Sequence, residues 1–229
     1  MSKGIFITGT GTDIGKTYVT GLLLKKLVDS GEKATYYKAA LSGAEKINGI
    51  LVPGDSKYVL ERAGLHIEPE SVVSYIYERA VSPHLASRIE GNPVNLDKVK
   101  RDFDELKKSY NYIIAEGSGG IICPIVYEEN NKIMLEDIIK KLDLDVIIVA
   151  DAGLGTINST VLTYRYLESI GIDVKGIILN NYKKDDFMHI DNVKMIEEIL
   201  NTRVLACVEQ GDTELNMNID ELKGIFKEI

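Results

Sequence analysis

A glycine-rich segment near the N-terminus carries the residue types that bind phosphate groups. It reads GTGTDIGKT over residues 9–17, follows a short apolar run and precedes a helical pattern. Glycines let backbone N–H groups point at a phosphate, and a helix that begins there adds partial positive charge. In this arrangement Lys16 reaches the outer phosphates and the Thr17 hydroxyl can bind Mg²⁺. The segment predicts a phosphate-binding loop; the alternative is a tight strand-to-helix turn without a ligand.

The spacing of this loop departs from the strict pattern. A glycine is expected five residues before Gly15, but Thr10 stands there, between Gly9 and Gly11. The same glycines also fit a loose dinucleotide-binding pattern. A nicotinamide site needs an acidic residue at the end of the second strand to hold the ribose, and Lys38 closes that strand instead. A variant phosphate loop is therefore favoured over a dehydrogenase.

Short β-branched runs alternate with helical patterns along most of the chain. The predicted strands are Gly4–Thr8, Ala34–Lys38, Tyr112–Ala115, Asp145–Ala150, Lys175–Leu179 and, more weakly, Arg203–Val208. The predicted helices are Lys16–Ser30, a segment capped by Asn95, Leu135–Leu142, Ile157–Ile170 and His189–Leu200. Strands separated by helices predict a doubly wound α/β fold with a mainly parallel sheet and helices on both faces. We expect a single domain over residues 1–229, and residues 39–54 show no clean period.

Composition excludes several classes of protein. The 27 Lys and Arg residues against 35 Asp and Glu give a net charge of −8 without a basic run, which argues against nucleic acid as a partner. Cys123 and Cys207 are too few for a disulfide framework or a four-cysteine zinc site, and we expect them in the core. The N-terminus resembles neither a signal peptide nor a membrane span, so we expect a cytoplasmic protein without a membrane partner. The amphipathic stretch 219–229 is expected to dock on the domain.

Three further segments follow the ends of predicted strands, at the edge where open α/β sheets bind ligands. They are KAALSG at 38–43, EGSGG at 116–120 and GLGTIN at 153–158. With the phosphate loop, and with Ser82-Pro83-His84 between them, this order resembles the dethiobiotin synthetase family of P-loop NTPases over residues 5–181. The resemblance implies a ligase that uses ATP, Mg²⁺, CO₂ or bicarbonate, and 7,8-diaminononanoate. It also implies a homodimer with shared active sites.

The resemblance assigns catalytic roles to Lys38, Lys16 and Thr12. Lys38 is expected to contact the carbamate and the γ-phosphoryl oxygens; the alternative is a strand-end lysine whose charge reaches solvent. Ser42 and Thr12 are expected to bind the diamine or carbamate, although both types are also common in turns. The far carboxylate of the diamine is expected at the 153–158 segment of the neighbouring subunit, at Gly155, Thr156 and Asn158.

Three oxygen donors are expected to bind Mg²⁺: Thr17, Asp55 and Glu116. Asp55 is alternatively a helix N-cap. Asp151 also ends an apolar strand and is a rival for Glu116. Glu116 is preferred because glycines that let backbone approach a nucleotide follow it, and because it stands at the family's ligand position.

The nucleotide site implied by the resemblance is larger than the loop itself. Its expected members are Asp13, Ile14, Gly15, Lys16, Thr17, Tyr18, Asp55, Glu116, Gly117, Ser118, Gly119, Asn180, Asn181 and Glu209. The resemblance places Asn180 at the family's adenine-binding position. An amide suits this role, because it can both donate a hydrogen bond to a base edge and accept one from it. Three residues depart from the family's pattern: Asn181 replaces a common Asp, Ala39 replaces the proline after the lysine, and Glu209 stands near where relatives carry proline.

A competing class is the switch-type P-loop ATPases of the partitioning or division-site kind. Those proteins carry an extra lysine at the start of the loop and often a basic amphipathic terminal helix. This loop starts with Gly9-Thr10, and the stretch 219–229 contains two lysines against three acidic residues. An anionic membrane would not attract such a stretch, so the ligase is favoured.

Overall fold

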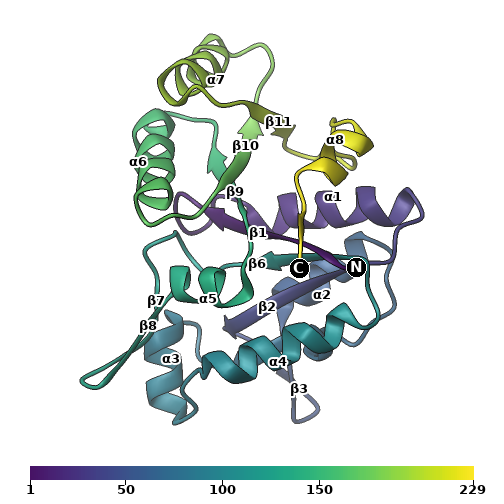
Figure 1. Cartoon of the computed structure of the whole chain (residues 1–229), viewed down its shortest axis with the longest axis vertical. Coiled ribbons are helices and arrows are strands. Elements are labelled where there is room, and N and C mark those ends of the chain that lie inside the picture. The colour runs from purple at the N-terminus through teal and green to yellow at the C-terminus, as the bar shows by residue number, and fades with distance from the viewer.

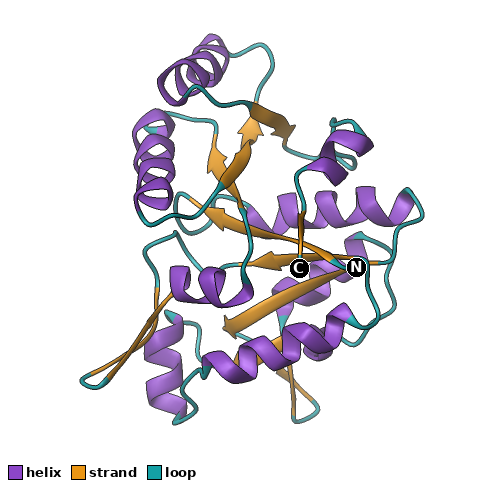
Figure 2. Ribbon diagram, viewed as in Figure 1, coloured by secondary structure: helices purple, strands orange, loops and turns teal.

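The computed structural model describes residues 1–229 and is built around a parallel sheet (Figures 1 and 2). The strands of this sheet are β1 Lys3–Gly9, β2 Ala34–Ser42, β5 Val73–Tyr77, β6 Tyr112–Glu116, β9 Val146–Asp151, β10 Val174–Tyr182, β11 Val204–Glu209 and β12 Lys227–Glu228. Their order is β11-β10-β9-β1-β6-β2-β5, and β12 pairs antiparallel with the start of β1. All six predicted strands are confirmed. The edge strand β5 was not predicted.

The helices of the sequence pattern are also present. The helices are α1 Lys16–Asp29, α2 Gly54–Arg62, α3 Pro83–Glu90, α4 Leu96–Lys107, α5 Leu135–Leu142, α6 Thr156–Ser169, α7 Phe187–Leu200 and α8 Ile219–Gly224, with a 3₁₀ turn η1 at Pro69–Val72. The sequence pattern missed α2 and α3, since each is short and buries only three residues. None of the helices is both long and apolar enough to cross a membrane.

Helices cover both faces of the sheet, as the doubly wound prediction requires. Along β1, Ile5 and Ile7 belong to the core under α1, α2 and α8, whereas Phe6 belongs to the core under α3 to α7. This alternation follows from the two-residue period of a strand, and burial on both faces explains the continuous apolar runs. Leu222 and Phe226 are buried in the first of these cores, so the expected docking of the C-terminal stretch is confirmed.

Two antiparallel hairpins project from the body of the molecule (Figure 1). One pairs β3, Glu45–Ile47, with β4, Ile50–Val52, and the other pairs β7, Pro124–Glu128, with β8, Asn131–Met134. The β3–β4 hairpin lies within residues 39–54, whose sequence shows neither a helical nor a strand period. Neither hairpin belongs to the central sheet, because each pairs only with itself.

Candidate active site

The phosphate loop connects β1 to α1 and requires glycine at its closest contacts. A Cβ on Gly9 would lie 2.5 Å from the Ile14 side chain, and Gly15 has a φ of 86° in the left-handed region. Asp13 also has a positive φ, at 58°. A non-glycine residue is strained in this region, and strain of this kind is concentrated at functional sites.

Lys16 begins α1 and folds back over the loop. Its side chain is buried, and its Nζ donates a hydrogen bond to the Gly11 carbonyl at 2.8 Å. Burial lowers the pKa of Lys16, and the nearby Glu116 carboxylate partly offsets that effect. A lysine with few protein partners in a shielded position interacts strongly with a phosphate, because little water competes for its charge.

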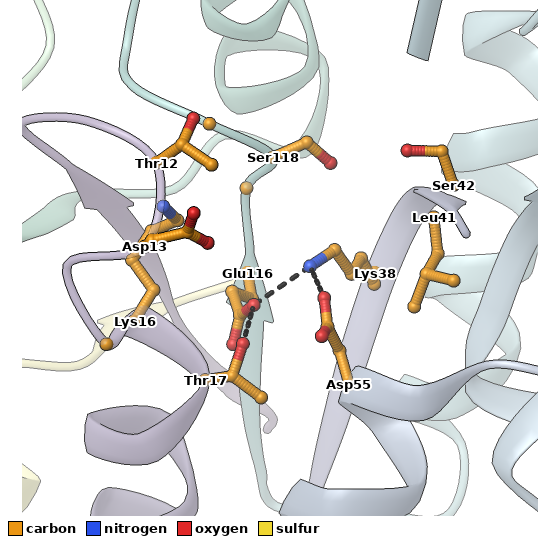
Figure 3. A pocket seen from close by; sticks show the side chains of 13 residues that line it. Thr12, Asp13, Lys16, Thr17, Lys38, Leu41, Ser42, Asp55, Glu116 and Ser118 are labelled. Carbon is orange, nitrogen blue, oxygen red and sulfur yellow. Dashed lines mark hydrogen bonds and ion pairs between the residues drawn. The ribbon is translucent and has the colours of Figure 1, made fainter. Parts of the chain in front are cut away.

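Lys38 and Glu116 are brought together by strand register. The two residues lie opposite each other on the neighbouring strands β2 and β6. Lys38 Nζ donates to Glu116 Oε1 at 2.9 Å and to Asp55 Oδ2 at 2.5 Å, as the dashed lines of Figure 3 show. Only 4% of Lys38 and 2% of Glu116 are exposed, so the alternative of a strand-end lysine that reaches solvent is wrong.

The two carboxylates decide the charge of Lys38. Burial by itself lowers the pKa of Lys38, because a charge is poorly solvated inside a protein. The charges of Glu116 and Asp55 and their hydrogen bonds outweigh burial and raise the pKa of Lys38 well above its usual range. Lys38 is therefore a fixed positive charge at neutral pH.

The three oxygen donors expected to bind Mg²⁺ lie together in the structure. Thr17 Oγ1 donates to Glu116 Oε1 at 3.0 Å, and Glu116 Oε2 is buried without a hydrogen-bond partner. Asp55 is the second residue of α2, whose N-cap is Pro53, so the N-cap alternative for Asp55 is wrong. No group of three His, Cys, Asp or Glu residues surrounds a metal position. Two carboxylates and a hydroxyl nevertheless suit a hard cation that completes its shell with water and phosphate oxygens.

A cavity of about 450 Å³ opens above these groups at the carboxyl edge of the sheet. Its lining residues are Thr12, Asp13, Gly15, Lys16, Thr17, Lys38, Leu41, Ser42, Asp55, Glu116, Gly117, Ser118 and Gly119. Leu41 is the one lining residue to which the sequence assigned no role, because nothing in its residue type distinguishes it from a core leucine. In Figure 3 the hydroxyls of Thr12, Ser118 and Ser42 lie along the side opposite Thr17 and Asp55. The cavity is polar and suits an anionic ligand.

The other expected site residues lie outside this cavity. Gly155 and Thr156 form the start of α6, and Asn158 lines a separate cavity of about 330 Å³ beside Thr10. Glu209, at the end of β11, lines a third cavity of about 490 Å³ with two lysines of the 183–187 segment.

Three residues that were expected to contact the nucleotide form side-chain hydrogen bonds to other parts of the protein. Asn180 is buried, and its Nδ2 donates to the Ile14 carbonyl at 2.9 Å. A Cβ on Gly15 would lie 2.0 Å from that Nδ2, so the loop needs glycine there. Asn181 Nδ2 donates to Asp151, and the Tyr18 hydroxyl donates to the Asp212 carbonyl at 2.5 Å.

Solved structures share the architecture. The chain matches the division protein MinD of Aquifex aeolicus with a TM-score of 0.55 and 17% identity, covering 96% of this chain and 86% of that one. It matches the ParA family ATPase of Chlorobium tepidum with a TM-score of 0.56 and 13% identity, covering 91% and 84%. At these identities the likeness shows the fold alone, so it does not favour the switch-type class.

The fold and the loop define a P-loop NTPase. A family model described as an AAA domain matches residues 3–216. The ATP-dependent dethiobiotin synthetase BioD of Clostridium novyi is 51% identical over 229 residues, covering 100% of this chain and 95% of that protein. Its counterpart in Clostridium perfringens is 47% identical over 226 residues, covering 99% of each chain. The chain belongs to the ATP-dependent dethiobiotin synthetase family, a family of ligases that form carbon–nitrogen bonds, and the resemblance is confirmed.

Proposed function

We propose that this chain closes the cyclic urea of dethiobiotin from 7,8-diaminononanoate, CO₂ and ATP. The observation that carries the proposal is the buried Lys38 ammonium, held between Asp55 and Glu116 in a polar cavity that the phosphate loop also lines. Family membership supports the same reaction. The carbamate, ATP and the carbamic–phosphoric anhydride are all anionic, so a fixed positive charge at this place serves each of them.

The reaction has three steps. One amine adds to CO₂ and loses a proton, which gives a carbamate. A carbamate oxygen attacks the γ-phosphorus of ATP, ADP leaves, and a carbamic–phosphoric anhydride forms. The second amine attacks the carbamoyl carbon and loses a proton, and inorganic phosphate leaves as the ring closes.

Each step uses positive charge from this chain. Lys16 and the backbone N–H groups of the loop bind the phosphates, and Lys38 binds the carbamate and the transferring phosphoryl oxygens. Thr17, Asp55 and Glu116 would hold Mg²⁺, which neutralises phosphate charge. The unpartnered Glu116 Oε2 supports this assignment.

Hydroxyls and backbone complete the proposed site. Thr12 and Ser42 orient the diamine or carbamate, and residues 117–119 approach the nucleotide. Asn180 Oδ1 accepts from the exocyclic amine of adenine, while Asn180 Nδ2 stays on the loop carbonyl of Ile14. Asp13, Ile14, Gly15, Tyr18 and Glu209 are assigned to the nucleotide side of the site.

The chain works as a homodimer with shared sites in this proposal, and we assign it to the cytoplasm. Three large apolar side chains on and around α6 support a protein interface: Leu154 is 92% exposed, Ile122 64% and Leu162 62%. Ile122 and Leu162 line the same cavity as Asn158. If a second copy covers this patch, Gly155, Thr156 and Asn158 of the first copy would contact the carboxylate of the diamine that is bound in the second copy's cavity.

The proposed reaction is tested directly. The protein is incubated with Mg-ATP, ¹³C-bicarbonate and 7,8-diaminononanoate, and the products are identified by mass spectrometry. A labelled cyclic urea in a one-to-one ratio with ADP is expected. Omission of the diamine is the control, and ATP turnover that ignores the diamine contradicts the proposal.

Shared sites are tested by complementation between two variants. Lys38→Ala removes the lysine, and Asn158→Glu places a negative charge where the diamine carboxylate is expected. Each homodimer is expected to be nearly inactive, whereas a refolded mixture regains activity because one of its sites combines two intact halves. A mixture as inactive as its components contradicts the shared site.

A further inference from the structure

We propose that Asn181 is a positioning residue for the diamine: through Asp151 it holds the loop that begins α6. The inference rests on the proposed function. It separates the roles of two neighbouring amides at the end of β10, because Asn180 serves the phosphate loop and Asn181 serves the loop on the substrate side.

The contact between Asn181 and Asp151 is specific. Asn181 Nδ2 donates to Asp151 Oδ2 at 2.6 Å. The backbone of Asn181 is in the left-handed region, with a φ of 56°, a conformation that asparagine tolerates better than most other residues with a side chain. The chain thus holds a sparsely populated backbone conformation at the residue whose amide reaches Asp151.

Asp151 also binds the backbone of the loop that follows β9 and leads into α6. Its second oxygen, Oδ1, accepts from Gly153 N–H at 2.8 Å. A Cβ on Gly153 would lie 2.9 Å from the same oxygen, so a side chain there would displace either the Asp151 carboxylate or the turn. Both carboxylate oxygens of Asp151 are therefore used by protein donors, which explains the role of Asp151 without a metal ion.

The loop is held from two further directions. Ala152 N–H donates to the Asn180 carbonyl at 2.8 Å. Asn192, a buried residue of α7, donates from Nδ2 to the Ala152 carbonyl at 2.9 Å and to the Gly153 carbonyl at 3.3 Å. Residues 152–153 are held by these hydrogen bonds, and one residue further on Gly155 is the N-cap of α6, with a φ of 91° and no side-chain cap.

The side-chain amide of Asn180 contacts a different loop. Asn180 Nδ2 contacts the Ile14 carbonyl of the phosphate loop and not the 151–155 loop. Loss of the Asn180 amide therefore acts on the nucleotide, whereas loss of the Asn181 amide acts on the α6 terminus.

Electrostatics predicts the direction of the effect. The N-terminus of α6 favours an anion, and the two donors to Asp151 offset its negative charge. If the Asn181 amide is removed, one Asp151 oxygen loses its donor close to the position proposed for the diamine carboxylate. Repulsion and loss of the turn geometry both weaken diamine binding.

The first experiment separates the two substrates. Asn181→Gly keeps the left-handed backbone accessible and removes the amide. We expect the KM for the diamine to rise about tenfold, the usual effect of one hydrogen bond to a charged group, with the KM for ATP within twofold. Asn180→Ala is the matched variant, and it is expected to raise the KM for ATP instead. Equal changes in both KM values for Asn181→Gly, or none, overturn the proposal.

The second experiment exchanges the two side chains. Asp151→Asn alone places two amides together, and Asn181→Asp alone places two carboxylates together. The double variant restores one donor and one carboxylate, so its KM for the diamine is expected to return to within about threefold of the wild type. Failure of the double variant to improve on either single variant overturns the pairing.

Hydrogen exchange gives a readout that does not depend on the reaction. Asn181→Gly is expected to speed amide exchange in residues 152–158 and to leave residues 9–15 unchanged. A wild-type protein that makes no cyclic urea refutes the proposed function, and exchange then decides the positioning role by itself. Unchanged exchange in residues 152–158 refutes that role.

Discussion

At the scale of single residues, Lys38 is the centre of the site's electrostatics. Its ammonium lies between the two carboxylates that we assign to a cation, and all three groups face one cavity. Glu116 is fully inside the protein, so its charge depends on Lys38 and Thr17 for compensation. The same lysine therefore has a structural role and a proposed catalytic one, and the two are separable by experiment.

Lys38→Met removes the ammonium and keeps much of the side chain's volume. Cyclic urea formation is expected to fall by about 10²-fold to 10³-fold, with ATP binding largely retained. In Mg²⁺-free buffer the free energy of unfolding is expected to fall by about 3 kcal/mol, because Glu116 stays buried without its partner. Product analysis and urea denaturation measure the two effects.

Lys46→Met is the control for this variant, because Lys46 is in an exposed ion pair whose loss has little effect on stability. Unchanged activity of Lys38→Met removes the lysine from the mechanism.

The Cys123 thiol is buried, and we expect it to be unreactive. Burial raises the pKa of Cys123 from 9.0 to about 11. At pH 8 roughly one molecule in a thousand carries the thiolate, so we expect slow alkylation by iodoacetamide in the native protein and rapid alkylation in guanidinium. Because the folded state prefers the protonated thiol, its contribution to stability is complete below pH 9 and is lost as the pH rises to about 11. Peptide mass spectrometry measures the labelling, and rapid labelling at pH 8 contradicts this prediction.

At the scale of elements, strand register and helix termini place the chemistry. Lys38 and Glu116 meet because β2 and β6 are neighbours in register, although 78 residues separate them in the chain. Asp55 reaches the pair from the first turn of α2. The short α2, which the sequence pattern did not reveal, is thus the element that delivers the third charged group.

The N-cap of α4 is a test of local stability away from the site. Asn95 accepts from the backbone N–H groups of Asp97 and Lys98 at 2.9 and 3.0 Å. Asn95→Ala is expected to lower the free energy of unfolding by about 1 kcal/mol and the melting temperature by about 2–4 °C, with unchanged activity. Asn95→Asp keeps the acceptor and serves as the control in calorimetry. An Asn95→Ala variant as stable as the control shows that the cap contributes nothing.

At the scale of the whole molecule, the charge of −8 coexists with a proposed site for anions. The positive charge at the site is local: Lys16 and Lys38 are both buried beside the start of α1, where a helix terminus adds to them. In the proposed function a triphosphate is bound by short-range contacts inside this cavity, where solvent screens little. The overall charge acts on distant partners and has little effect at this distance.

We propose that residues 1–229 unfold as one domain, because the two cores lie on opposite faces of one sheet. Calorimetry is expected to give one transition, with equal calorimetric and van't Hoff enthalpies. Mg-ATP at about one hundred times its Kd is expected to stabilise the fold by about 2.7 kcal/mol and to raise the melting temperature by about 5–10 °C. Two separate transitions, of which ATP shifts only one, contradict the single domain.

Local pattern was sufficient for much of the fold. The apolar runs of β1, β6 and β9 and the helical period of α1 are visible in the sequence because burial on a sheet or a helix face imposes a repeat. The glycine loop and its neighbouring segments also identified the family, since their chemistry depends on residue type and order. Strand β5 and the two hairpins escaped because short elements with mixed exposure leave no clear period.

Tertiary structure decided which of these residues meet. No pattern in the sequence states that β2 lies beside β6, and without that neighbour a strand-end lysine remains an alternative for Lys38. Asn181 was assigned to the nucleotide, yet its amide holds Asp151, because β10 and β9 are neighbours at that edge of the sheet. Residue types and local periods set which chemistry the chain carries. Pairing between distant segments, which depends on the packing of the whole sheet, sets where each group acts.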